Sequence, residues 1–551
     1  MSDRGLVAVA VLAGVLALVA PAVPVALATV LLVVAAVTRR PVAVGIAVAL
    51  VVGARAHQAL DALDRPLPTS VRGTAELVGD PRPGRYGTQV EVRIAGRRWL
   101  ADVDRTREWV LRPLLTGDHV RLTAAARPLT GAPEPWVRSR HLAGRLDVRT
   151  VGRGPPAAPW LRLANRVHRS LADGSESFGP ERQSLFLGLV LGDDRAQSDL
   201  ERFRFRATGL GHLLAVSGQN VAFLLAVAAP LLERCGPRAR WVLGLVVLLV
   251  FVLVTRAEAS VLRAAAMAGV ALTAVALGRV ASGARVLGLA VVALLLVDPL
   301  LVWSVGFQLS VCASAGLLVG VRPLARRLPG PRWVAEPVAT TVAAQVATMP
   351  LLVPLAGGIP SVATLANVLA VPAAGLVMAL GMSAGLVAGW VVPPAAAVVN
   401  VPARLLVAWV EAVARVGSAT PLPLLGPDRL VLLGAGVVAV VLGRRRLPLA
   451  TVLLAGALVA VALWPAAPGA GRYRPAPGVV LEVAPCGSRT VSMAAAGPGG
   501  DALGVLPGLQ RLGVVRADVV TAGRGAAADA AQVAEQLGAR LVVPASAGRS
   551  C

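Results

Sequence analysis

Several polar side chains lie within stretches of the chain that are otherwise apolar enough to cross a membrane. The densest group is in the run Gly209-Leu-Gly-His-Leu-Leu-Ala-Val-Ser-Gly-Gln-Asn. A polar group in hydrocarbon must find a partner, because an unpaired group there is very costly. This placement predicts a pathway, a site or contacts between helices. The candidates for lining a pathway are His212, Ser217, Gln219, Asn220, Arg263, Gln308, Ser310, Gln345 and Asn367.

Each candidate also has a purely structural interpretation. Gln and Asn can join helices by hydrogen bonds, and Ser can bond its own backbone. Arg263 could pair with Glu258 or anchor a helix end. On an ideal helix, however, His212 shares a face with Gln219 and Asn220. The full set, which includes a His and an Arg, therefore favours a hydrophilic passage.

A membrane serine hydrolase is a further interpretation of this segment, because Ser217 precedes Gly218 and His212 is near. A nucleophile and its base must lie within hydrogen-bond reach. Five positions on an unbroken helix place the two side chains about 140° apart, so we expect no catalytic residue here. A hydrolase is the least favoured interpretation.

The composition predicts the elements that must position these residues. The chain has 551 residues, of which 56% are hydrophobic and 15% charged, and its mean hydropathy is +0.71. These values exclude an ordinary soluble globular protein and predict a polytopic α-helical membrane protein. The formal charge of +24 comes from Arg, since no Lys occurs. It supports an anionic partner only weakly, because a general bias towards Arg and positive cytoplasmic loops explain it equally well.

Changes of composition divide the chain into five parts. Alternating segments such as Thr88-Gln-Val-Glu-Val-Arg-Ile, with Gly/Pro turns between them, predict a small all-β domain of about five strands. Its size suits an OB-like barrel, which could serve as an adaptor or as a ligand-binding domain. The predicted parts are anchor spans at 1–53 (the third span over Pro41 to Val52), the OB-like β domain at 54–151, amphipathic and linker helices at 152–208, a transmembrane core at 209–465 and a short α/β unit at 478–551.

Within the linker, the stretch after Trp160 predicts an interfacial amphipathic helix with Leu161, Leu163 and Val167 opposite several Arg residues. The clusters Arg234/Arg238/Arg240, Arg322/Arg326/Arg327/Arg332 and Arg444-Arg445-Arg446 are expected on the cytoplasmic side. The apolar runs between them then alternate sides without conflict, and both soluble units lie outside the cell.

Cysteine usage predicts no metal site. Cys235, Cys312, Cys486 and Cys551 form no CxxC pair and no cluster with His. Cys486 and Cys551 could form a bridge if their unit is extracytoplasmic, although unpaired thiols are the favoured interpretation. We expect no cofactor.

Several separated motifs resemble the ComEC family of competence proteins, multispan channels that internalise single-stranded DNA in bacteria. The run from Thr208 to Val221 is similar to the signature helix of that family. The other matching motifs, in order along the chain, are Leu191-Gly-Asp193, Ser260-Val-Leu-Arg-Ala, Asp298-Pro-Leu-Leu, Gly306-Phe-Gln-Leu-Ser and Asn367-Val-Leu-Ala-Val-Pro372. The resemblance covers the membrane core, and the family's order of anchor spans, OB-like domain and core matches the division above.

Many members of that family carry a C-terminal metallo-β-lactamase-like domain, and this tail resembles its beginning. The segment Val480-Leu-Glu-Val-Ala-Pro-Cys-Gly-Ser is similar to the opening strand and glycine turn. The family's metal loop carries clustered His and Asp ligands, whereas this chain has Ala522-Gly-Arg-Gly-Ala-Ala-Ala-Asp529 and no His after His212. We therefore predict a truncated, degenerate remnant without nuclease activity.

The resemblance implies a non-enzymatic channel for single-stranded DNA in the bacterial plasma membrane. A cytoplasmic DNA-translocating motor and an outer DNA receptor are the implied partners, beside the lipid bilayer. Phosphates would be screened by Arg and polar groups. The alternative is a transporter for another small or lipid-linked solute built on the same core.

Overall fold

The computed structural model describes residues 2–433 apart from 39, 85–86, 132, 215–217, 329 and 421. Beyond them it describes 435, 457–459, 461–463, 469–476, 479–483, 488–493, 502–512, 514, 516–522 and 527–542. Ser217, Cys486, Cys551 and the cluster Arg444-Arg445-Arg446 lie outside the described residues. Cys235 and Cys312 are free thiols.

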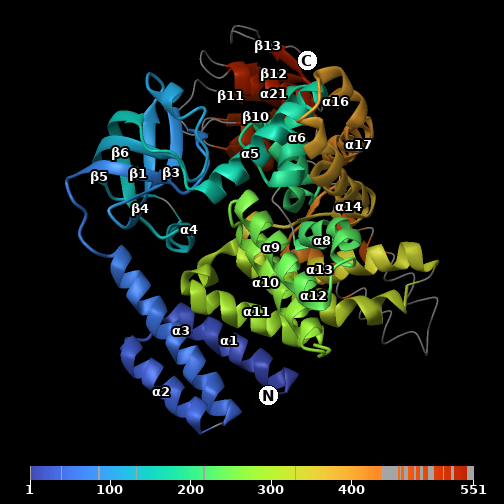
Figure 1. The fold of residues 1–551 in the computed structure, drawn as a ribbon. Helices are drawn as coiled ribbons and strands as arrows, with labels where there is room; N and C mark the ends of the chain where they lie inside the picture. The colour runs from blue at the N-terminus through green and yellow to red at the C-terminus, as the bar shows by residue number, and fades with distance from the viewer. Residues whose placement is uncertain are drawn as a thin grey trace.

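Apolar helices make up most of the molecule (Figure 1). Six described helical segments are long and apolar enough to cross a membrane. They are α3 (Pro41–Leu63), α9 (Pro237–Val254), α10 (Ala259–Ala276), α12 (Val305–Ala325), α13 (Arg332–Ala356) and the segment Ala363–Ala388, which contains α14 (Ala363–Leu380), η5 (Gly381–Gly385) and α15 (Leu386–Ala388). A bent pair, α16 (Pro393–Val399) and α17 (Val401–Ser418), meets at 59°. Shorter apolar helices are α2 (Val25–Val37), α8 (Gly218–Leu232) and α11 (Gly283–Val297).

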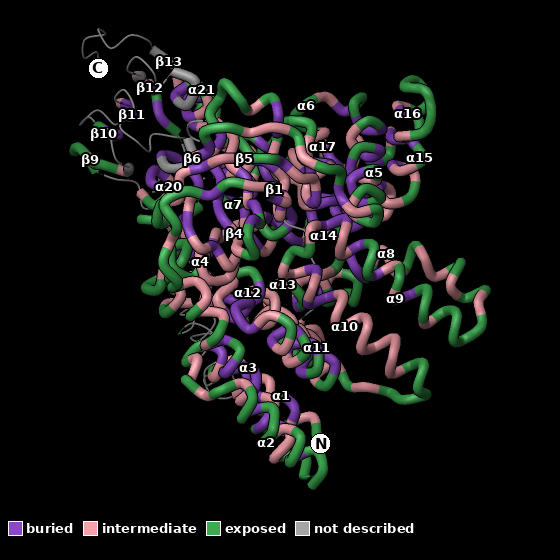
Figure 2. The backbone as a smooth tube through the Cα atoms, turned by 60° about the vertical axis from the view of Figure 1, so that its left-hand side comes forward, coloured by how far each residue is buried: buried purple, intermediate pink, exposed green. Residues whose placement is uncertain are grey.

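Many of these helices expose residues along their length (Figure 2). The exposed side chains are largely apolar, as with Leu249 at 59% and Val319 at 78%. Lipid takes the place of water around such faces, so apolar exposure is expected of them. The predicted polytopic α-helical membrane protein with a small all-β domain is confirmed.

The N-terminal helices α1 (Asp3–Val19), α2 and α3 form one end of the molecule (Figure 1). The chain turns between α1 and α2 at Ala20, whose backbone is left-handed. The prediction that the third span ends at Val52 is wrong, because α3 continues to Leu63 and the first β-strand begins only at Ser70. Small residues such as Ala54 and Ala56 are buried in this extension.

The β domain is a single sheet that closes on itself. Its strands are β1 (Ser70–Leu77), β2 (Arg82–Gly84), β3 (Gly87–Ile94), β4 (Arg97–Asp104), β5 (His119–Arg127) and β6 (Leu142–Arg153). The strand order is β1-β5-β6-β4-β3-β2, and β1 also pairs with β3. The β4–β6 pair is parallel, and the other pairs are antiparallel. Alternate residues such as Val90, Val92 and Ile94 fill the interior, as the period-two pattern predicts.

Three helices connect the β domain to the core: α5 (Pro159–Gly174), α6 (Pro180–Leu191) and α7 (Asp199–Ala207). In helix α5, Leu163 of the predicted apolar face is 51% exposed. The buried stripe instead contains Asn165, His168 and Leu171. Helix α5 packs into the largest hydrophobic core together with residues of α6, α8, α9, α14 and α17.

The C-terminal α/β unit is a five-stranded sheet with two helices. Its elements are β9 (Gly471–Ala476), β10 (Val479–Val483), β11 (Arg489–Met493), α20 (Ala502–Arg511), β12 (Val519–Ala522), α21 (Ala527–Leu537) and β13 (Arg540–Val542). Leu200, Phe203 and Ala207 of α7 belong to its hydrophobic core. Helix α7 therefore supplies apolar surface to a unit that is small for a core of its own.

Candidate functional site

The segment after Gly209 is not one continuous helix. Gly209 has a φ of +71°, a short 3₁₀ helix η3 (Gly211–Leu213) follows, Leu214 lies in a bend and α8 begins at Gly218. The prediction that His212 shares a helical face with Gln219 and Asn220 is therefore wrong. The angle of about 140° between the side chains of His212 and Ser217 also assumes an unbroken helix, so it does not apply either. His212 is exposed, and its Nδ1 lies 3.2 Å from the carbonyl oxygen of Gly209.

Arg263 on α10 is a cation in the membrane core with neutral partners. Its Nε donates to Oγ of Ser310 on α12 at 2.5 Å, and its Nη1 lies 3.0 Å from Sδ of Met267. The residue is only 8% exposed. Among the described residues no carboxylate forms an ion pair with it, so Glu258 is not its partner. Two predicted pathway residues, Arg263 and Ser310, are thus brought into direct contact.

The start of α8 faces this guanidinium. A Cβ at Gly218 would lie 2.6 Å from Nη2 of Arg263, so glycine leaves the space that the guanidinium occupies. The next residue, Gln219, is exposed, and Nδ2 of the buried Asn220 donates to the carbonyl oxygen of Leu189 at 3.2 Å. Gln219 and Asn220 line one small pocket together with Leu189 and residues of α14.

The other predicted pathway residues form hydrogen bonds within or between helices of the core. Oε1 of Gln345 accepts a hydrogen bond from Thr364 at 3.0 Å, which connects α13 to α14. Nε2 of Gln308 donates to the carbonyl oxygen of Val302 at 2.7 Å. Nδ2 of Asn367 donates to the carbonyl oxygen of Ala363 within its own helix at 2.7 Å. These contacts are of the kind expected if the polar side chains have a purely structural role and bond to other helices or to the backbone.

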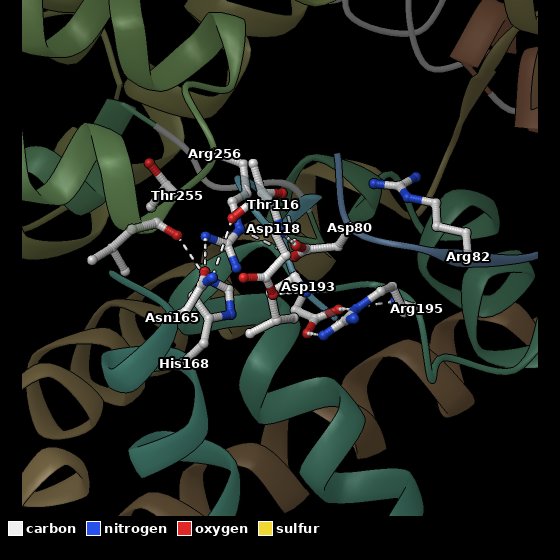
Figure 3. A network of polar contacts seen from close by, with 12 residues as sticks. Asp80, Arg82, Thr116, Asp118, Asn165, His168, Asp193, Arg195, Thr255 and Arg256 are labelled. Atoms are coloured by element: carbon white, nitrogen blue, oxygen red, sulfur yellow. Dashed lines mark hydrogen bonds and ion pairs between the residues drawn. The ribbon is translucent and has the colours of Figure 1, made fainter. Parts of the chain in front are cut away.

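A second polar cluster lies where the β domain meets the membrane core (Figure 3). Asp80, in the turn after β1, accepts from the backbone and side chain of Thr116, each at 2.7 Å. Nε of Arg256, in the turn between α9 and α10, donates to Oδ2 of Asp80 at 3.1 Å. Nη1 of Arg256 donates to Oδ1 of Asn165 at 2.8 Å, and Asn165 donates to the carbonyl oxygen of Thr116 at 3.2 Å. These bonds connect the β domain, α5 and the α9–α10 turn.

The α6–α7 loop completes this junction. Arg195 holds Asp193 with two hydrogen bonds, Nε to Oδ1 at 2.8 Å and Nη2 to Oδ2 at 2.7 Å. Arg82 of the β domain forms an ion pair with Asp194 at 3.3 Å. His168 on α5 donates from Nε2 to the carbonyl oxygen of Val254 at 2.6 Å.

Burial and neighbouring charges set the protonation states at the junction. Burial alone would raise the pKa of Asp80, but Arg256, Arg195 and the bond from Thr116 outweigh it and lower that pKa to about 2. Burial lowers the pKa of His168 to about 4, and the Arg256 guanidinium acts in the same direction. At neutral pH the junction therefore pairs ionised Asp80 with Arg256 around a neutral His168.

A second contact between the β domain and the core involves His141. Its Nε2 lies 3.0 Å from both carboxylate oxygens of Asp298, which also accepts from the backbone N–H of Leu300. Beside it, the guanidinium of Arg138 lies 4.4 Å from the ring centroid of Trp303 in η4 (Pro299–Trp303). The sequence predicts no role for Asp80, Asn165 or Arg256. Their polar types in short turns and on α5 gave little signal, because their partners are far away in sequence.

Residues 189–449 match the family model described as Competence protein. This part of the chain belongs to the competence protein family. The membership supports a role in competence and DNA uptake. No curated protein and no solved structure matches the chain.

The competence motifs map onto the contacts just described. Ser260-Val-Leu-Arg-Ala carries the buried Arg263, and Gly306-Phe-Gln-Leu-Ser carries its partner Ser310. Leu191-Gly-Asp193 ends at the carboxylate held by Arg195. Asp298-Pro-Leu-Leu provides the acceptor for His141 of the β domain. Two motifs thus lie at the buried cation, and two lie where the core receives the connecting loop and the β domain.

Proposed function

We propose that the competence core conducts single-stranded DNA across the plasma membrane and that Arg263 contacts its phosphates on the way. The observation that carries this proposal is a membrane-embedded guanidinium that is 8% exposed and bonded to a hydroxyl and a thioether. A buried charge is stable only when paired or well hydrogen-bonded. A passing phosphate is a counter-anion of the right geometry, since guanidinium donors match phosphate oxygens.

The surroundings of Arg263 support this role. Ser310 orients the guanidinium through Nε, so that Nη2 is left beside the start of α8, where Gly218 leaves room. The exposed Gln219 follows directly on α8 and offers both a donor and an acceptor to a polar strand. A path of this kind would screen phosphates without stripping all of their hydration.

We further propose that the β domain and the C-terminal unit lie outside the cell. Both are at the end of the molecule opposite α1 and α2 (Figures 1 and 2). This agrees with the orientation that the Arg clusters favour. In this arrangement an OB-like domain could receive DNA from an outer receptor, and a cytoplasmic motor would draw the strand inward.

The channel is proposed to transport without hydrolysing DNA. The support is chemical: the tail lacks the His-rich ligand set that two-metal hydrolysis uses, since no His follows His212. Metal-dependent cleavage of DNA by the purified full chain, absent from a mock preparation, would contradict this part of the proposal.

The test is uptake of fluorescent DNA in a deletion strain that carries the full chain or a variant. Arg263→Gln removes the cation, and a lost charged hydrogen bond of about 1.5–3 kcal/mol corresponds to roughly 10- to 150-fold slower uptake. Gly218→Ala keeps the charge but displaces the guanidinium, and it should also slow uptake. Arg238→Gln, which removes an exposed arginine at the start of α9, is the control and should transport normally.

Two outcomes would overturn the proposal. Undiminished uptake in the deletion strain would exclude the DNA channel and favour a transporter for another solute. Equal uptake by the Arg263 and Arg238 variants, at matched membrane levels, would exclude Arg263 as the phosphate contact.

A further inference from the structure

Glycines bring α12 and α13 into close contact along their hairpin. A Cβ at Gly316 would lie 2.4 Å from Cβ of Ala347, and one at Gly320 would lie 2.9 Å from Cβ of Ala343. Small residues four apart on both helices let the backbones approach each other. Larger side chains beside this seam then stand as ridges on either side of it.

These ridges border a groove on the surface of the hairpin. Its volume is about 380 Å³, within the range of about 300–1,000 Å³ that is usual for ligand sites. Its apolar walls include Val319, Pro323 and Leu324 of α12 and Val342 and Val346 of α13. Val319 is 78% exposed and Val346 58% exposed, so the groove opens towards the lipid.

The groove has the length of one bilayer leaflet. The lining runs from Gly316 to Arg327, eleven residues along the chain, which corresponds to about 16 Å at 1.5 Å per residue. A leaflet contributes about half of the roughly 30 Å hydrocarbon core. An acyl chain lying in the groove would therefore end near the bilayer centre while its headgroup lay beside Arg327.

That end of the groove is strongly basic. Arg327 lines it, and Arg322, Arg326 and Arg332 are exposed nearby in the chain. Within the described part of the chain none of these four guanidinium groups forms an ion pair. Trp333, 78% exposed at the start of α13, is the kind of residue that lies at headgroup level.

We propose that this groove binds an anionic phospholipid, with one acyl chain between α12 and α13 and the phosphate at Arg327. The charge of the site selects the occupant, because basic pockets between membrane helices recognise anionic headgroups. A second copy of the chain fits poorly, since a symmetric contact would bring like-charged arginine clusters together. The inference does not depend on DNA transport.

The experiment is native mass spectrometry of the delipidated full chain titrated with phosphatidylglycerol or phosphatidylcholine. Phosphatidylglycerol should be retained as a discrete adduct, and Arg327→Gln should weaken it about tenfold, as expected for loss of one charged hydrogen bond. Val346→Phe, which fills the groove from its exposed side, should weaken both lipids. The matched controls are Arg238→Gln and Val246→Phe, which make the same changes at exposed sites on α9.

Three outcomes would overturn the proposal. These are equal retention of the two lipids, equal effects of the Arg327 and Arg238 variants, and a protein dimer that Val346→Phe dissociates. Thermal unfolding of each variant confirms that it is folded. Because the readout is lipid retention, failure here leaves the DNA proposal untouched, and failure of DNA uptake leaves this one untouched.

Discussion

The ion pair between Asp80 and Arg256 should be the strongest single contact between the β domain and the membrane core. The two side chains are 10% and 11% exposed, and their closest atoms are 3.1 Å apart. Arg256→Gln would leave the Asp80 carboxylate buried beside Thr116 without its principal counter-charge. Breaking one partner of a buried pair typically destabilises a protein by about 3–5 kcal/mol.

The pKa of Asp80 gives an independent magnitude. Its pKa is about 2 in the folded protein against an ordinary value of 3.8, and one pKa unit corresponds to about 1.36 kcal/mol. The ionised form is therefore favoured by about 2 kcal/mol. Because the folded pKa is depressed, this stabilisation is present above pH 3.8 and is lost as the pH falls towards 2. This free energy from the pKa and the roughly 3–5 kcal/mol typical of breaking a buried pair agree to within a few kcal/mol.

The assay is equilibrium unfolding of the detergent-solubilised full chain, followed by tryptophan fluorescence, in a double-mutant cycle. Arg256→Gln should destabilise by about 3 kcal/mol, and adding Asp80→Asn should recover part of the loss because no buried charge remains. Arg127→Gln is the control, since its pair with Asp147 is 67% and 40% exposed and should be worth less than about 1 kcal/mol. Equal losses in the Arg256 and Arg127 variants, or strict additivity in the cycle, would refute the reasoning.

Three further predictions concern groups elsewhere in the chain. The pKa of His168 is lowered to about 4, so stability should fall as the pH drops from 6.5 to 4; in His168→Gln this part of the pH–stability curve should flatten. Burial raises the pKa of Glu201 to about 7, so Glu201→Gln should stabilise by roughly 1–3 kcal/mol at pH 8, discounted for partial exposure, and by much less at pH 5. Equilibrium unfolding of the His168 and Glu201 variants at pH 8 and pH 5 checks both predictions. A variant whose stability depends on pH as that of the unmodified protein does would contradict its prediction. Gly316→Ala should lower the unfolding temperature because its Cβ meets Ala347, whereas Gly14→Ala, in open space on α1, should raise it slightly; equal shifts would show that the α12–α13 seam is not tight.

The regular elements were largely predictable from the sequence. Apolar runs of membrane length identified the spans, and period-two alternation identified the β domain, because each pattern reflects which faces meet an apolar environment. The predicted third span ends too early, at Val52, because the pattern follows the environment of the helix. Residues Ala54 to Leu63 include Arg55, His57 and Asp61, so hydropathy falls although the backbone remains helical. Hydropathy reports the environment of a helix rather than its length.

The sites were less predictable, because they depend on contacts across long separations. Asp80 and Arg256 are 176 residues apart, and neither has a local partner that would mark it. An unbroken helix would place His212 and Asn220 on one face, whereas the chain bends at Leu214 after the 3₁₀ turn. Arg263 is conspicuous in the sequence, because a cation in an apolar run stands out without any knowledge of its neighbours, and its role in a pathway stays a prediction.

The junction and the buried cation are linked through the start of α10. Arg256 and Ala257 have φ values of +59° and +55°, a left-handed conformation that costs roughly 1–2 kcal/mol for each non-glycine residue. The bonds from Arg256 to Asp80 and Asn165 can offset this cost, so the β domain stabilises the turn in its strained form. Helix α10 begins two residues later, and Arg263 lies four residues, about 6 Å, beyond that start. The bonds from the β domain and α5 therefore hold the turn that immediately precedes the helix carrying Arg263.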